Sequence, residues 1–190
     1  CMFDLPMRHA PEVARDGGRE FAIEPVHNGG TGARPHADGL SATAYPSGVW
    51  GSQIEITESV APVTIWRREL RPDSGGAGQY RGGLGQRIEL SASNDAAFMV
   101  FLSVERLKFP APVRAGGRSG APGRIRFAGG DADLPGKGEL RVEPGQRLIF
   151  ETPGGGGFGD PTLRDAGALE QDLARGLVTP DGAKDYGDAS

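Results

Sequence analysis

The chain has 190 residues, of which 37% are hydrophobic, and its formal net charge is only −4. This balance excludes the low hydrophobicity and high charge of a disordered chain, although 32 glycines and 15 prolines predict many loops. The acidic balance argues against nucleic acid, and the apolar run from Ala96 to Leu102 is too short to cross a membrane. One cysteine permits no internal disulfide, so we expect a cytoplasmic protein.

Residues 1–20 show no clear pattern, and we interpret them as an opening segment that continues from a missing upstream region. Residues 21–160 predict a β-rich domain, because short runs of period two are bounded by Gly, Pro, Asn or Asp. No helical period is evident from Ile54 to Phe150, so the fold class is mainly β, α+β overall, with an antiparallel sandwich or barrel-like body. The predicted strands are 53–57, 63–70, 87–90, 97–104, 124–127, 139–142 and 147–150, with 97–104 central and buried on both faces.

Residues 161–190 predict a short C-terminal helical tail. Asp165 can cap a helix whose apolar stripe is formed by Leu169, Leu173 and Leu177. Thr179 followed by Pro180 then predicts the start of a last short helical turn.

Two glycine-rich segments, 29–48 and 70–85, are punctuated by single polar side chains, which favours shaped loops over a flexible linker. Arginines there can hold a carboxylate or phosphate, and hydroxyl or amide groups can orient a carbonyl. The alternative is that these residues stabilise tight turns by local hydrogen bonds. The candidate substrate-binding or partner-binding residues are Asn28, Arg34, Asp38, Ser41 and Thr43 on the first loop, and Arg71, Asp73, Ser74 and Arg81 on the second.

The residues for self-contained catalysis are missing from the sequence. There is no G-x-S-x-G motif, and the three histidines, His9, His27 and His36, are typical of turn or surface positions. His36 and Asp38 lack the further ligands of a metal site, so no metal ligand is assigned. Gly154–Gly159 matches G-x-G-x-x-G, but Asp160-Pro161 prevents a helix from following, which excludes a dinucleotide fold. The catalytic residues therefore stay unassigned, and no cofactor is expected on this chain alone.

Charge is unevenly distributed along the chain. Residues 106–126 contain five arginines and Lys108 without an acidic residue, whereas the tail from Asp160 onward has seven acids and three bases. The basic stretch is either a solvated strand face or a surface that meets an anion or a partner.

The two loops resemble the hydantoinase B/5-oxoprolinase family, which includes the large subunits of acetone and acetophenone carboxylases. The resemblance rests on five motifs and covers nearly the whole chain from about Phe21: Gly29-Gly-Thr-Gly-Ala-Arg-Pro, Asp38-Gly-Leu-Ser-Ala-Thr, Glu69-Leu-Arg-Pro-Asp-Ser-Gly-Gly-Ala-Gly, Arg81-Gly-Gly-Leu-Gly and Thr152-Pro-Gly-Gly-Gly-Gly-Phe-Gly-Asp-Pro. Members are much longer, and this chain looks like their C-terminal third. The family typically has glycine where His36 stands.

The resemblance implies a hydrolase that opens the C–N bond of a cyclic amide after ATP-dependent phosphorylation. It implies a hetero-oligomer in which ATP and Mg bind a separate A-type subunit with an actin-like ATPase fold, and a divalent metal binds the missing upstream part. The isolated chain is then expected to be inactive. A ketone carboxylase subunit of the same family, acting on a ketone substrate, and a non-catalytic assembly module are the alternatives.

Overall fold

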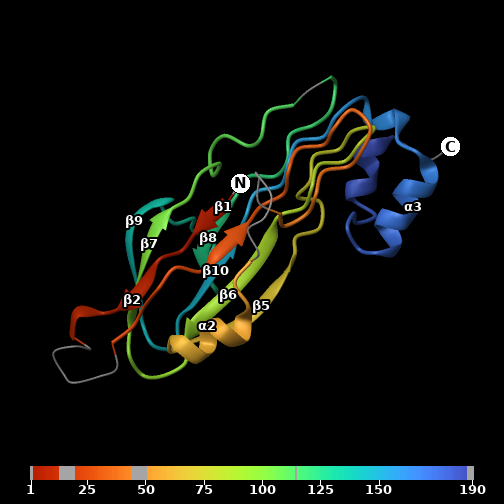
Figure 1. The fold of residues 1–190 in the computed structure, drawn as a ribbon. Helices are drawn as coiled ribbons and strands as arrows, with labels where there is room; N and C mark the ends of the chain where they lie inside the picture. The colour runs from red at the N-terminus through yellow and green to blue at the C-terminus, as the bar shows by residue number, and fades with distance from the viewer. Residues whose placement is uncertain (1, 13–19, 44–50, 114, 188–190) are drawn as a thin grey trace.

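The computed structural model describes residues 2–12, 20–43, 51–113 and 115–187. Figure 1 shows a β-rich body at one end and a helical tail at the other. The strands are β1 Met2–Asp4, β2 Met7–His9, β3 Ala22–Ile23, β4 Val26–Asn28, β5 Val63–Leu70, β6 Gln86–Ala92, β7 Phe98–Ser103, β8 Arg124–Phe127, β9 Lys137–Val142 and β10 Arg147–Glu151. The helices are α2 Ile54–Val60 and α3 Ala166–Ala174, with 3₁₀ turns η1 Pro161–Leu163 and η2 Gly182–Tyr186.

Two four-stranded antiparallel sheets form the body, in the orders β5-β6-β10-β8 and β3-β2-β7-β9. Alternate side chains of both sheets meet in one hydrophobic core, because a strand presents every second residue to the same face. Leu90 lies opposite Leu148 in the first sheet, and Met7 lies opposite Val100 in the second. The predicted sandwich is confirmed, and the sheets do not close into a barrel.

The predicted strand at 97–104 forms as β7, and it is central, between β2 and β9. Its burial was predicted wrongly. Phe98, Val100 and Leu102 are buried in the core, but Met99 and Phe101 between them are only half-buried. One face of this sheet is therefore open within the described chain.

The opening segment also carries structure that its sequence did not predict. β1 pairs with β4 in a small two-stranded sheet, and β2 joins the second four-stranded sheet. Each of these strands has only three residues, which is too short to display an alternating pattern.

The predicted strand at 53–57 is wrong, since this segment begins helix α2. Ile54 and Ile56 fit a two-residue period by chance, whereas Ile54 and the buried Thr57 lie three residues apart on one helix face. Thr57 also donates its hydroxyl to the carbonyl oxygen of Gln53 at 2.9 Å. The helix ends before Pro62, which cannot continue it. The expectation of no helix between Ile54 and Phe150 is corrected accordingly.

Glycine-rich stretches run side by side from the sheets to the helical tail (Figure 1), and we call them the glycine bundle. Backbone hydrogen bonds join the stretches: Gly83 donates to Thr31, Gly155 to Gly83, and Gly76 to Gly155, each at 2.9 Å. The bundle consists of residues 29–40, 74–85, 117–121 and 152–159.

The bundle requires glycine because its backbones lie too close together for side chains. A Cβ atom at Gly155 would lie 1.8 Å from the carbonyl oxygen of Thr31, and one at Gly82 would lie 2.0 Å from that of Gly155. The glycine-rich segments thus have a defined conformation, as predicted, but it is fixed by the contacts of the segments with one another. Residues 44–48 of the first segment lie outside the described residues.

The tail folds as predicted around α3, whose N-terminal N–H group at Ala168 bonds the Asp165 side chain at 2.9 Å. Leu169 and Leu173 pack on a small second core formed by Ala77, Val178 and Tyr186. Leu177, the third residue of the predicted stripe, is only half-buried, outside this cluster. Neither helix in the described part of the chain is long and apolar enough to span a bilayer.

Candidate functional site

Asp38, a predicted site residue, lies where the glycine bundle meets the tail. Its carboxylate accepts hydrogen bonds from the backbone N–H of Arg81 at 2.7 Å and from both terminal nitrogens of Arg164 at 2.9 and 2.8 Å. Burial alone would raise the pKa of the Asp38 carboxyl, but the hydrogen bonds and positive charge of Arg164, with the Arg81 N–H, outweigh it. The pKa is therefore held below its usual value, and Asp38 is ionised.

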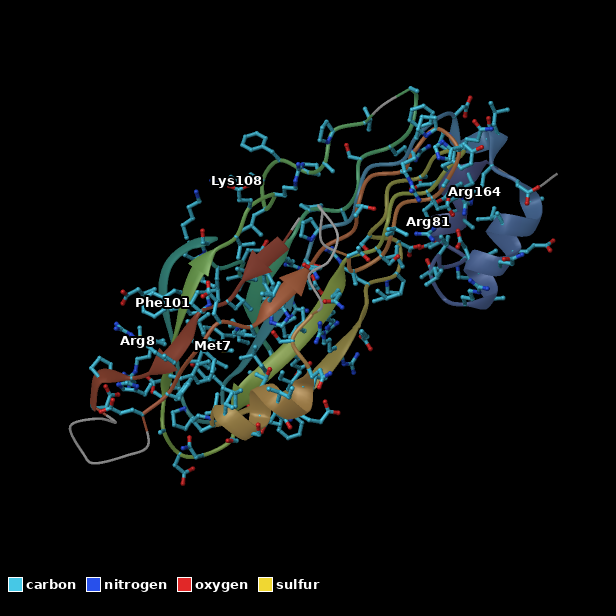
Figure 2. The ribbon with its side chains drawn as sticks, in the orientation of Figure 1. Met7, Arg8, Arg81, Phe101, Lys108 and Arg164 are labelled. Carbon is cyan, nitrogen blue, oxygen red and sulfur yellow. The ribbon has the colours of Figure 1, made fainter. Side chains whose placement is uncertain are left out.

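The side chain of Arg81 meets a second acid, Asp172 of α3, at 2.9 Å. Asp172 also accepts a hydrogen bond from Arg164 at 2.6 Å. Figure 2 shows Arg81 and Arg164 together beside the helical tail, far from the β-rich body. We call Asp38, Arg81, Arg164 and Asp172 the ionic quartet. Two arginines and two carboxylates balance one another there, so the quartet has no net charge.

Tyr186 closes the quartet on one side. The Arg164 guanidinium carbon lies 5.6 Å from the centre of the Tyr186 ring, within range of a cation–π contact. Burial raises the pKa of Tyr186 to about 12, so its hydroxyl stays protonated near neutral pH. Each charged group of the quartet is already engaged with another, which suits a structural clamp better than an acid or base.

Asp73, on the second predicted loop, holds a different part of the tail. Its carboxylate accepts hydrogen bonds from the backbone N–H of Thr179 at 2.8 Å and from the Thr179 hydroxyl at 2.6 Å. Asp73 adopts a left-handed φ of 58°, which aspartate tolerates better than most residues. Thr179 in turn accepts from the N–H of Gly182 at 3.1 Å, although the last turn η2 begins at Gly182 with Asp181 as its N-cap, two residues later than predicted.

Ser74 and Arg71 fix the turn that carries Asp73. The Ser74 hydroxyl donates to the carbonyl oxygen of Arg71 at 2.6 Å and accepts from the N–H of Gly85 at 2.9 Å. Arg71 donates to the carbonyl oxygen of Pro122 at 2.7 Å and lies 4.0 Å from Glu151. Burial lowers the pKa of Arg71, but the group remains a cation.

The first loop is held by its own polar residues. Ser41 accepts from the N–H of Leu84 at 3.0 Å, and Thr43 donates to the carbonyl oxygen of Ser41 at 2.9 Å. Arg34 is exposed and donates to the carbonyl oxygen of Asp38 at 3.4 Å. Asn28 is buried, and its side-chain oxygen has no partner among the described residues.

The structure therefore brings Asp38 and Arg81 together across the two loops and distributes the remaining predicted residues along the bundle. It adds Arg164, Asp172 and Tyr186, which sequence reasoning missed because they lie in the tail, more than 80 residues from Arg81. A partial signal existed, since Arg164 is one of only three bases in the acidic tail.

His27 is not the turn or surface residue that its sequence position predicted. It is 2% exposed, and neither ring nitrogen has a hydrogen-bond partner among the described residues. Burial, with a smaller contribution from the charge of Arg68, lowers the pKa of His27 to about 4. The imidazole is therefore neutral at physiological pH.

Within the described ranges, no three His, Cys, Asp or Glu side chains are grouped closely enough to bind a metal.

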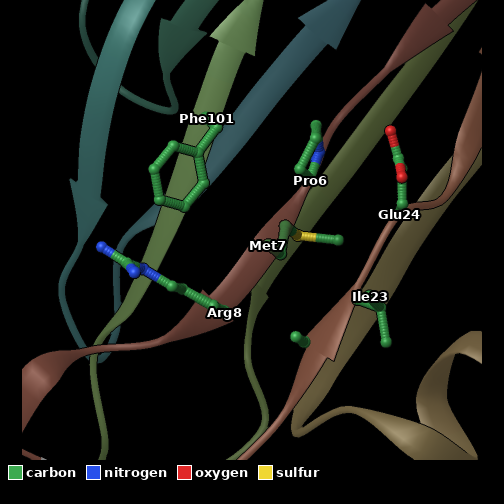
Figure 3. Close-up of a pocket in the computed structure, with 7 residues that line it drawn as sticks. Pro6, Met7, Arg8, Ile23, Glu24 and Phe101 are labelled. Carbon is green, nitrogen blue, oxygen red and sulfur yellow. The ribbon is translucent and has the colours of Figure 1, made fainter.

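A shallow hollow of about 410 Å³ lies on the β3-β2-β7-β9 sheet (Figure 3). Its walls are largely apolar, with Met7 and Phe101 among them. Arg8 lies 4.8 Å from the centre of the Phe101 ring, and Glu24 is the acid on the wall. No Ser, Thr, Cys or His side chain lines this hollow, so it offers no nucleophile paired with a base. We therefore take the tail end of the glycine bundle, where the predicted residues Asp38 and Arg81 meet, as the candidate functional site.

Comparison with known proteins points to one family. The family model described as hydantoinase B/oxoprolinase matches residues 6–161. The caprolactamase β subunit of Pseudomonas jessenii is 37% identical over 170 residues, which are 83% of this chain and 29% of that protein. The 5-oxoprolinase 1 of Arabidopsis thaliana is 34% identical over 143 residues, 73% of this chain and 11% of that protein.

Solved structures agree with the sequence relatives. The ATP-dependent caprolactamase from Pseudomonas jessenii superposes with a TM-score of 0.80 at 30% identity, over 97% of this chain and 33% of that chain. A nucleotide-free acetone carboxylase gives a TM-score of 0.72 at 21% identity, over 98% of this chain and 29% of that chain, which shows the fold alone. The chain thus spans about a third or less of the length of these proteins. The family-model match over residues 6–161 and the 37% identity to the caprolactamase β subunit show that the chain belongs to the hydantoinase B/oxoprolinase family.

Proposed function

We propose that the chain is the C-terminal part of a B-type subunit that opens a cyclic amide in an ATP-dependent reaction, together with an A-type ATPase subunit. The observation that carries this proposal is the agreement of 97% of the chain with one third of the ATP-dependent caprolactamase chain. ATP and Mg are assigned to the A-type subunit, and a divalent metal to the remaining part of the B-type subunit.

Within such an enzyme, the chain supplies a rigid scaffold. The N–H groups of Gly76, Gly83 and Gly155 are already bonded between the stretches of the bundle, so they are not donors for a substrate oxyanion. The ionic quartet is similarly occupied. Arg34 is an exposed predicted site residue whose side chain makes one hydrogen bond, at 3.4 Å, although its backbone is bonded to Ala37. We assign its side chain to the substrate or partner surface.

Two alternatives lie close to this proposal. The first is a ketone carboxylase subunit of the same family, in which the activated carbonyl is carboxylated instead of the ring being hydrolysed. The structural use of Asp38, Asp73 and Arg81 supports a non-catalytic assembly module.

The test is reconstitution of the chain with the A-type subunit and the rest of the B-type subunit. We expect ATP-dependent ring opening of caprolactam, 5-oxoproline or a hydantoin by the assembly, and none by the chain alone. Bicarbonate-dependent consumption of a ketone would support the carboxylase alternative. Appreciable ATP-dependent turnover by the isolated chain would falsify the division of roles.

The variants Arg34→Ala and Asp38→Ala separate a chemical role from an assembly role. Normal assembly with lost turnover assigns a loop residue to the reaction, whereas failed assembly supports the module. Because Asp38 belongs to the quartet, we expect Asp38→Ala to impair assembly, and Arg34→Ala to assemble normally and to lower turnover.

A further inference from the structure

A second hollow, of about 460 Å³, lies beside β8, the edge strand of the first sheet. Backbone hydrogen bonds fix its walls: Gly123 donates to the carbonyl oxygen of Arg106 at 3.0 Å. Leu134 similarly donates to the carbonyl oxygen of Ile125 at 2.8 Å. The hollow is therefore preformed, and its volume lies in the range of small-molecule sites, about 300–1,000 Å³. Its walls come from three segments, 107–108, 123–125 and 133–136.

The floor of this hollow is apolar and belongs to the main core. Ile125 is 1% exposed, and Leu107 and Leu134 pack against the same core cluster. Leu107 also lies close against Gly136, because a Cβ atom there would lie 2.3 Å from Leu107 Cδ1. Side chains anchored in this way do not move to fill the hollow, so an aliphatic ligand buries apolar surface there.

The charges on the walls of the hollow favour an anion. The exposed Lys108 (Figure 2) forms no ion pair among the described residues. Arg124 donates to a carboxylate oxygen of Asp133, so these two charges offset each other. The three charged residues that line the hollow thus leave one net positive charge, that of Lys108. An anion contact is one of the two roles that the sequence left open for the basic stretch 106–126.

We propose that this hollow binds a small aliphatic carboxylate, with its carboxylate on Lys108 and its hydrocarbon body on Leu107 and Leu134. Hydrolysis of a lactam ring forms a molecule of this class, because the amide carbonyl becomes a carboxylate and the released amine stays at the other end of the methylene chain. The identification of the ligand as that product rests on the proposed function, whereas the carboxylate site does not.

The test is ligand-observed saturation-transfer NMR on the B-type subunit that contains this chain, without the A-type subunit and without ATP. Hexanoate is the probe, and we expect a dissociation constant on the order of 1 mM for so small a ligand. 6-Aminohexanoate, the product of caprolactam opening, should compete with hexanoate. Hexylamine has the same hydrocarbon chain but a positive charge, and it should not compete.

Two variants of opposite expected effect identify the charges that act on the ligand. Lys108→Gln should weaken hexanoate binding by about 3- to 10-fold, because it removes the free positive charge. Asp133→Asn should strengthen binding by about 2- to 5-fold, since it frees the charge of Arg124 for the carboxylate. A residue that only supported the shape of the hollow would weaken binding when changed.

Lys137→Gln is the matched control, because Lys137 is exposed and follows Gly136 in the chain but does not line the hollow. Its affinity for hexanoate should stay within about twofold of that of the unmodified subunit. Thermal unfolding verifies that all variants fold.

The possible failures are distinct. If hexanoate does not bind, or if Lys108→Gln binds it equally well, the carboxylate site is overturned and the proposed function is unaffected. Equal binding of hexylamine would also overturn the site, because the hollow would then accept any aliphatic chain. If 6-aminohexanoate does not compete with bound hexanoate, the link to the ring-opened product is overturned. If the reconstituted enzyme opens no ring while hexanoate binds through Lys108, the proposed function fails and the carboxylate site is supported.

Discussion

Arg164 joins the tail to the first glycine-rich loop, because its guanidinium donates to the carboxylate of Asp38 at 2.8 Å across 126 residues of chain. The same nitrogen lies 2.6 Å from Asp172, whose side chain is 7% exposed. Because these charges are buried, removing one of them would leave its partner buried without a counter-charge, which lowers the stability of the fold.

We predict that Asp172→Asn lowers the free energy of unfolding by about 3–5 kcal/mol, because it leaves two buried arginines with one carboxylate. Asp38→Asn should cost less, since the Asp38 side chain is 35% exposed and water can replace part of the interaction. Urea unfolding measures both, with the exposed Glu170→Gln as the control on the same helix. Equal stability of Asp172→Asn and the unmodified chain would contradict the clamp.

The glycine bundle predicts a sharp contrast between two alanine substitutions. Gly155→Ala places a Cβ atom 1.8 Å from the carbonyl oxygen of Thr31, so the backbones must separate, at a cost of at least about 1–3 kcal/mol. Gly32→Ala lies in the same bundle, but its nearest contact is 3.9 Å away.

Gly32→Ala should therefore be neutral, or stabilising by up to about 1 kcal/mol through the unfolded chain. Thermal unfolding of the two variants side by side checks this contrast. A similar loss for both would mean that the effect of alanine is not steric.

The sequence predicted the parts of this fold whose signals are local. The alternating residues of β5 and the Asp165 cap of α3 are visible over a few positions, and both formed. The prediction failed at α2, because residues 53–57 are compatible both with the two-residue period of a strand and with the period of a helix. It also failed at β1 and β2, which are too short to show any period.

The site was only half predictable for a similar reason. Asp38 and Arg81 stand out among glycines, so they could be named from the sequence. Their partners Arg164 and Asp172 could not, because nothing local distinguishes a buried ion-pair partner from a surface charge on a helical tail. The glycines were predicted to form shaped loops, and they do, but their direct contact with one another is a long-range property that no local pattern shows.

His27 makes stability depend on pH. Its pKa is about 4 in the fold and about 6.5 in a model peptide, so the unfolded chain binds more protons between these values. The contribution of His27 is fully present above pH 6.5 and is lost as the pH falls toward 4. The linked loss is about 3 kcal/mol at most.

Urea unfolding from pH 4 to pH 7 should therefore show a rising stability that His27→Leu flattens. His36→Leu, which removes an exposed histidine of the first loop, provides the control. Asp38 adds to the loss of stability at lower pH. Its pKa is lowered in the fold, so folding opposes the protonation of its carboxylate. An unchanged slope in His27→Leu would show that the imidazole is not the titrating group.

Asp73 predicts how firmly the last turn of the tail is held. Asp73→Ala removes both bonds to Thr179 and places alanine at a left-handed φ of 58°, so we expect a loss of about 2–3 kcal/mol. Asp73→Asn keeps an acceptor oxygen and tolerates that φ, and it should cost less. Because the two bonds fix the chain just before η2, amide hydrogen exchange at Ala183 and Lys184 should accelerate in Asp73→Ala more than exchange in α3. Uniform acceleration across the tail would instead mean that the tail unfolds as one unit, with Asp73 supporting all of it.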